Sequence, residues 1–195
     1  GFFFLITQYF QFVKGYSPLR AGIAGLPFAL TMILMSPRSD GLVQRFGMNR
    51  VVATGFGSIA LGFAWLGLVN PDTHYVLIAV GLVLLANGMA ISIAPATGAI
   101  MSSVPLNKAG VGSAVNDTTR EFGGALGIAV LGSIVAARYR SAFDTSGLPA
   151  DVAEIAGESV GAAVAVARGL GGEPGRALID QAGVAFTDAV NTAFV

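Results

Sequence analysis

Cysteine is absent from this chain of 195 residues, and charged residues are scarce. Without cysteine the chain has no disulfide framework and no thiol chemistry. Its formal net charge is zero, so there is no bulk attraction to nucleic acid, and we expect no nucleic-acid partner. Only 11% of the residues are charged, whereas soluble domains average about a quarter. So little charge cannot cover a globular surface, which indicates a polytopic membrane protein.

The patterns that mark enzymes and nucleotide-driven machines are also missing. The sequence contains no phosphate-binding P-loop and no cluster with metal-ligand spacing. No nucleophile is accompanied by a base and an acid. We therefore expect no cofactor, no metal and no catalytic residues, and the chain is not predicted to be an enzyme.

Apolar residues make up 54% of the chain and cluster in long runs. A membrane-spanning helix needs about 20 apolar residues, and only helices or closed barrels satisfy their backbone polar groups in lipid. The runs lack the alternation of a strand, so they predict helices. A buried core helix would explain any one run, but five or six in succession argue against it. The predicted fold is an all-α polytopic transmembrane bundle with spans over 1–13 (cut short), 21–35, 51–69, 75–104, 109–137 and the start of a sixth over 176–195.

Residues 138–175 are more polar and acidic than the predicted spans. Their apolar run over 160–167 is too short to cross a bilayer, so we expect a loop outside the membrane with a short surface helix. Disorder is the alternative, because "GLGGEPG" follows that run. Both ends of the chain fall within apolar runs, and we expect it to be part of a longer membrane protein.

Charged residues interrupt the apolar run over 109–137. A charge that faces lipid near the middle of the membrane costs at least about 2.5–3.5 kcal/mol. At 100° per residue, a helix places six polar or small residues within an arc of about 140°: Ser113, Asn116, Asp117, Arg120, Glu121 and Gly124. We therefore expect this polar stripe to face a water-filled cavity or other helices.

Two interpretations of the polar stripe remain open. Arg120 can pair with Asp117 or Glu121 along the helix and so lock the bundle. Alternatively, at least one carboxylate faces a cavity, where burial and a nearby cation shift its pKa in opposite directions. Such a carboxylate can exchange a proton or pair with a cationic substrate. Glu121, about 16 Å from the helix start against about 10 Å for Asp117, is nearer the midplane where transporters hold substrate and ions.

Two prolines fall inside predicted spans, Pro27 in 21–35 and Pro95 in 75–104. Proline leaves a helix carbonyl without its partner and bends the helix. We predict both as helix hinges, with static kinks as the alternative.

The polar loop "SPRSDGLVQRFGMNR" over 36–50 is rich in arginine. One interpretation is a gating loop, in which the arginines cap helix carbonyls and pair with acids of a neighbouring helix. The other is that they anchor the loop at the membrane surface. The loop resembles the signature G-x-L-x-D-R-x-G-R-[RK] that lies between spans two and three in each half of the major facilitator superfamily. Three positions fit: Leu42, Arg45 and Gly47. Asp40 stands where the first glycine belongs and Gln44 where the acid belongs, which resembles the degenerate second-half copy.

Two longer stretches carry a closer resemblance. Residues 8–30, "QYFQFVKGYSPLRAGIAGLPFAL", are similar to the first pair of spans in the C-terminal half of the fourteen-span drug/proton antiporters of the EmrB/QacA type. Residues 94–134, "APATGAIMSSVPLNKAGVGSAVNDTTREFGGALGIAVLGSI", are similar to the penultimate region of the same group. The resemblance implies spans nine to fourteen of such a protein. It also implies that 36–50 and 105–109 are cytoplasmic and 138–175 external.

The resemblance further implies a function: proton-coupled export of small amphipathic or cationic molecules by alternating access. Its partners would be the substrate, protons, the lipid bilayer and the missing N-terminal half of the same chain. Asp117 and Glu121 would be the coupling carboxylates in a cavity shared with Asn116, and Arg120 would tune them. A cytoplasmic gating loop would contain Asp40, Arg45, Gly47 and Arg50. The alternatives are a major-facilitator importer, a metabolite exporter or a membrane subunit that does not transport.

Overall fold

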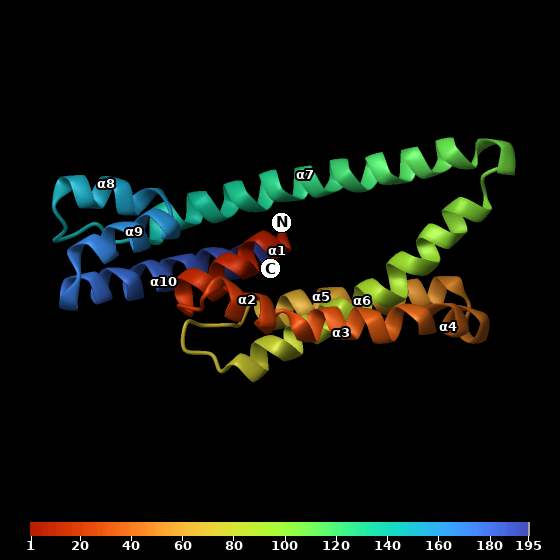
Figure 1. Cartoon of the computed structure of the whole chain (residues 1–195), viewed down its shortest axis with the longest axis horizontal. Helices are drawn as coiled ribbons and strands as arrows, with labels where there is room; N and C mark the ends of the chain where they lie inside the picture. Colours follow the sequence, from red (N-terminus) through yellow and green to blue (C-terminus); the bar gives the residue numbers. More distant parts are fainter. Residues whose placement is uncertain (195) are drawn as a thin grey trace. The chain divides into compact units, whose positions relative to one another are not determined.

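A computed structural model describes residues 1–194, with the side chain of Leu106 left out. Every regular element in that range is helical, which confirms the predicted all-α class (Figure 1). The helices are α1 (Phe2–Gln8), η1 (Tyr9–Val13), α2 (Pro18–Ala24), α3 (Leu26–Met35), η2 (Ser36–Arg38), α4 (Ser39–Phe46), α5 (Met48–Leu66), α6 (Tyr75–Ser102), η3 (Leu106–Lys108), α7 (Ala109–Ala142), α8 (Ala150–Glu158), α9 (Val160–Leu170) and α10 (Gly172–Phe194).

Three stretches of helix in the described chain are long and apolar enough to cross a membrane: Pro18–Phe46, Tyr75–Ser102 and Ala109–Ala142. They correspond to the predicted spans 21–35, 75–104 and 109–137. The predicted span 1–13 matches a shorter apolar helix, Phe2–Val13. Helices α5 and α10 occupy most of 51–69 and 176–195. The placement of each helix in a bilayer stays a prediction.

Two segments predicted as loops contain more helix than expected. Within 36–50, η2 and α4 are helical up to Phe46. Within 138–175, α7 continues to Ala142, and two helices, α8 and α9, follow instead of one. Helix α9 packs against α8 and α10 and buries one apolar face, Val160, Ala163, Val164 and Ala167. Ser159 accepts a hydrogen bond from the backbone N–H of Ala162, which caps the start of α9.

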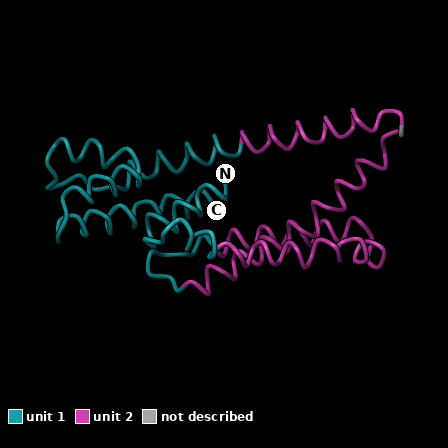
Figure 2. The backbone as a smooth tube through the Cα atoms, viewed as in Figure 1, with its two compact units in different colours: residues 1–24, 66–74, 127–195 teal, residues 25–65, 75–126 magenta. Residues whose placement is uncertain are grey.

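The chain divides into two compact units (Figure 2). Unit 1 consists of Gly1–Ala24, Leu66–His74 and Gly127–Val195, and unit 2 of Gly25–Trp65 and Tyr75–Leu126. The N-terminal half of α7 therefore belongs to unit 2, together with α3 to α6.

In unit 2, α6 is the central helix. Helices α3 and α4 both pack against it. Helix α5 is joined to it by side-chain hydrogen bonds: Ser58 Oγ donates to the Leu84 carbonyl at 2.7 Å, and Trp65 Nε1 donates to the Leu77 carbonyl at 2.8 Å. Small residues with hydroxyl groups are typical of tight helix contacts in membranes, where apolar burial does not drive association.

In unit 1, the connection between α5 and α6 is held by side chains from two helices. Tyr9 Oη donates to the Asn70 carbonyl at 2.8 Å, and Asn191 Nδ2 of α10 donates to the Val69 carbonyl at 2.9 Å. Lys14 Nζ donates to the Pro71 and Thr73 carbonyls, each at 2.6 Å. Burial lowers the pKa of Lys14 despite the opposing attraction of Asp72. These bonds satisfy backbone carbonyls of the connection, which also forms its own turn through hydrogen bonds between Asn70 and Thr73.

Candidate functional site

The predicted coupling residues lie on the N-terminal half of α7. Asp117, Arg120 and Glu121 are all exposed there, and Asn116 is half-buried. Asn116 Nδ2 lies 3.5 Å from Asp117 Oδ1, which is at the limit of a hydrogen bond. Among the described residues, no ion pair joins Arg120 to either carboxylate. Both interpretations of the stripe therefore remain predictions, with Asp117 and Glu121 available on the helix surface.

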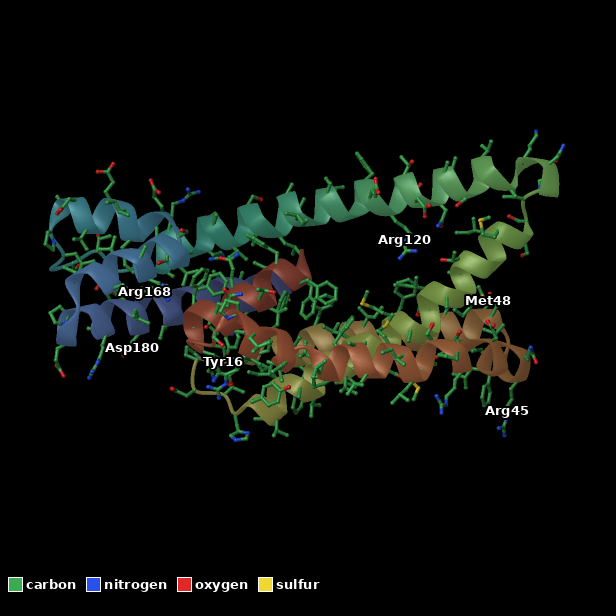
Figure 3. The ribbon with its side chains drawn as sticks, in the orientation of Figure 1. Tyr16, Arg45, Met48, Arg120, Arg168 and Asp180 are labelled. Atoms are coloured by element: carbon green, nitrogen blue, oxygen red, sulfur yellow. The ribbon has the colours of Figure 1, made fainter. Side chains whose placement is uncertain are left out.

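Part of the stripe lines a cavity within unit 2. The cavity has a volume of about 530 Å³ and lies between the C-terminal end of α6, η3 and the first turns of α7. Figure 3 shows the Arg120 side chain extending from α7 on the side of α6. The lining residues are Ile100, Val104, Lys108, Val111, Gly112, Val115, Asn116, Thr119 and Arg120. Of the predicted site residues, Asn116 and Arg120 are among them.

The stripe therefore divides into two adjoining faces of α7. Lys108, Gly112, Asn116 and Arg120 follow one another at intervals of four residues and line the cavity. Ser113, Asp117 and Glu121 follow at the same interval, one residue further along. Since four residues complete slightly more than one helical turn, each series forms a continuous row. The first row has a cation at each end, Lys108 and Arg120. The second row carries the carboxylates of Asp117 and Glu121.

Lys108 is the lining residue that sequence reasoning missed. The signal is its spacing of four from Gly112, but Lys108 comes just before the predicted span 109–137. Gly112 allows the closest approach in the cavity, because a Cβ at this position would lie 2.9 Å from Val104 Cγ2.

The predicted gating loop is a helix followed by a turn. Asp40 and Arg45 are exposed on α4, and Figure 3 shows Arg45 pointing outward. The Arg45 guanidinium carbon lies 5.3 Å from the centroid of the Phe46 ring. Gly47 ends α4 with φ 85° and ψ 148°, a conformation that side chains strongly disfavour. The segment is helical because Leu42, Val43 and Phe46 recur at helical spacing, although its charges suggest a loop.

Arg50 lies in the first turn of α5 and lines a second cavity in unit 2. This cavity has a volume of about 360 Å³ and includes Leu42 and Phe46 of α4, Val51 and Thr54 of α5, and Ile91 of α6. Arg45, Gly47 and Arg50 thus lie around the turn between α4 and α5, whereas Asp40 lies in the first turn of α4, and the role of all four in gating stays a prediction.

The two prolines have different positions. Pro27 lies in the first turn of α3, where the missing N–H removes no helical hydrogen bond. Pro95 lies inside α6, which continues through it to Ser102. Pro95 therefore interrupts the hydrogen-bond ladder of α6. Pro27 lies at the start of α3 and interrupts no ladder.

Comparison with known proteins places this helical architecture in a family. Residues 1–128 match the family model described as Major Facilitator Superfamily. The chain belongs to the major facilitator superfamily. It is a multi-pass membrane protein.

Three relatives within this superfamily match most of the chain. The multidrug efflux pump LfrA of Mycolicibacterium smegmatis is 35% identical over 97% of this chain and 38% of its own length. The methyl viologen resistance protein SmvA of Salmonella typhimurium is 32% identical over 95% of the chain and 38% of its own length. The cephamycin export protein CmcT of Amycolatopsis lactamdurans is 37% identical over 83% of the chain and 32% of its own length. The chain thus spans less than two fifths of the length of these relatives.

Proposed function

We propose that this chain forms part of a secondary transporter that exports small amphipathic or cationic molecules in exchange for protons. The observation that carries the proposal is the row of carboxylates on α7, in a chain that belongs to the major facilitator superfamily. Charges on a helix this apolar are costly unless they serve a cavity or a partner. Two of the relatives, a multidrug efflux pump and a cephamycin export protein, support the direction of transport.

The proposed mechanism uses Asp117 and Glu121 as proton acceptors. A proton that enters from outside neutralises one carboxylate, and a cationic substrate from the inner side favours its release. Arg120 is one residue from Glu121 and three from Asp117, so it stabilises the charged form of whichever carboxylate it approaches. Alternating access then requires the rest of the transporter, which we infer to resemble the fourteen-span EmrB/QacA type. In this proposal α4, Gly47 and Arg50 change contacts at the cytoplasmic end.

The test is proton flux in vesicles that contain the full-length transporter. Ethidium, a cationic dye, is supplied on the inner side, and the proton movement that it triggers is recorded for Asp117→Asn and Glu121→Gln. At least one substitution is expected to lower flux about tenfold or more, because an amide cannot carry the proton. Glu154→Gln in α8 is the control, since Glu154 is an exposed acid outside the stripe.

Unchanged flux in both α7 variants would contradict proton coupling at these residues and favour a structural role for the stripe. Transport of the dye against its gradient in the opposite direction, toward the inner side, would contradict export.

A further inference from the structure

The cavity between α6 and α7 has an uneven distribution of charge. Its charged lining residues are Lys108 and Arg120, both cations. Asp117 and Glu121 lie on the adjoining row of α7 and are not among its lining residues. Asn116 belongs to the row that lines the cavity, and its amide nitrogen lies 3.5 Å from Asp117 Oδ1 on the adjoining row. The cavity therefore presents positive charge.

Apart from Lys108, Arg120, Asn116 and Thr119, the lining of the cavity is apolar. Val111 is 65% exposed, Val115 is 60% exposed and Ile100 is 47% exposed, although each is a large hydrophobic residue. Lys108 and Arg120 are twelve residues apart, or about 18 Å along a helix at 1.5 Å per residue. An apolar surface thus separates Lys108 from Arg120, about three helical turns further along the chain. Exposed apolar surface rimmed by polar or charged side chains marks ligand-binding grooves as well as contacts with lipid or protein.

We propose that this cavity binds a small amphipathic anion. The carboxylate or sulfonate accepts hydrogen bonds from the Arg120 guanidinium, which suits a planar anionic group because it can donate two bonds side by side. The apolar body lies along Ile100, Val111 and Val115. Lys108 attracts the anion from the opposite end of the cavity. The volume of about 530 Å³ is within the usual range for small-molecule sites, about 300–1,000 Å³.

This proposal goes beyond proton-coupled export and does not depend on it. A cationic substrate would use the carboxylate row, whereas the anion uses the neighbouring cationic row. Binding of the anion is measured without flux, so failure of the coupling experiment leaves this proposal intact. Conversely, failure of anion binding leaves the coupling carboxylates untouched.

The test compares two ligands that differ in charge alone. Binding of 1-pyrenebutyrate and of its uncharged amide to the full-length protein in a neutral detergent is followed by fluorescence anisotropy. The carboxylate is expected to bind about tenfold more tightly than the amide. Arg120→Gln is expected to remove this tenfold preference, and Arg120→Lys to retain most of it. Lys108→Gln is expected to slow association about threefold and to weaken its dependence on salt.

A matched control variant and a lipid competitor distinguish an anion site at Arg120 from binding elsewhere and from binding of lipid. Arg140→Gln is the control, because Arg140 is an exposed arginine near the other end of the same helix. Equal affinity for the two ligands, or an equal loss in Arg140→Gln, would overturn the proposal. Complete displacement of the probe by an equimolar amount of phosphatidylglycerol would assign the cavity to a lipid and would overturn it too. If Arg120→Gln unfolds, the unmodified protein is compared at low and high salt instead. A preference for the carboxylate over the amide that is the same at both salt concentrations would overturn the proposal.

Discussion

Gly55 of α5 and Gly88 of α6 bring two helix backbones into direct contact. A Cβ on Gly88 would lie 2.4 Å from the Gly55 carbonyl oxygen, and a Cβ on Gly55 would lie 2.9 Å from the Gly88 carbonyl oxygen. Ser92, one turn further on α6, donates to the Val52 carbonyl at 3.5 Å. Since small residues let helices approach closely in a membrane, this contact fixes α5 against the central helix of unit 2.

Gly88→Ala is expected to destabilise the protein by about 1–3 kcal/mol, because its new methyl group meets backbone atoms that cannot rotate away. The measurement is thermal unfolding of the full-length protein in detergent. Gly98→Ala is the control on the same helix, since nothing lies within 4 Å of its Cβ position. Alanine is favoured over glycine in a helix by roughly 0.5–1 kcal/mol, so the control should hold or gain stability. Equal behaviour of the two variants would contradict the close contact.

Gly47→Ala is expected to destabilise the turn between α4 and α5. With φ 85° and ψ 148°, Gly47 has a conformation that is essentially restricted to glycine, and strain of this kind costs about 1–3 kcal/mol. Nothing lies within 4 Å of its Cβ position, so the effect comes from the backbone alone. Gly41→Ala, within α4, removes no such conformation and serves as the control. Unfolding temperatures that fall equally in both variants would show that the turn is not specifically strained.

Lys14→Met is expected to loosen the connection between α5 and α6. The substitution keeps the apolar stem but removes both hydrogen bonds to the Pro71 and Thr73 carbonyls. Hydrogen–deuterium exchange of the amides over 69–74 should become faster, while exchange in α6 should not change. Lys108→Met is the control, because Lys108 is exposed and lies in unit 2. Unaltered exchange over 69–74 would mean that Tyr9 and Asn191 alone order the connection.

The pH dependence of stability is a separate test of Lys14. Burial lowers its pKa from the usual 10.5, so the unfolded chain binds more protons than the folded one between the lowered value and 10.5. Stability from this group therefore rises as pH increases toward 10.5, and is lost as pH falls through the lowered pKa. The unfolding free energy of the unmodified protein, minus that of Lys14→Met, should increase over this window. A difference that decreases would contradict the burial of Lys14.

The helices and the family could be predicted from the sequence because their signals are local. Long apolar runs mark α6 and α7, and a segment of sequence is enough to recognise them. Segment 36–50 was harder, because its arginines suggest a loop while Leu42, Val43 and Phe46 place one apolar face on α4. Here the periodicity outweighs the polar composition.

The division of the polar stripe could not be predicted, because it depends on a neighbour. Helical periodicity places Asp117, Arg120 and Glu121 in one arc, but only the position of α6 decides which edge of that arc lines a cavity. That position depends on contacts across the turn between α6 and α7, such as Gly112 against Val104. The role of Lys108 follows from the same geometry.

Gly112→Ala is expected to narrow the cationic cavity without unfolding α7. Its new Cβ would lie 2.9 Å from Val104 Cγ2, so the Val104 side chain must shift to make room for it. We expect affinity for 1-pyrenebutyrate to fall about three- to tenfold, since the apolar wall loses its fit, while helix propensity keeps the unfolding temperature near that of the unmodified protein. Gly110→Ala is the control, because its Cβ position has no neighbour within 4 Å. If Gly112→Ala binds the probe as tightly as Gly110→Ala does, the probe does not contact this wall, and the anion must be held by Arg120 from another side.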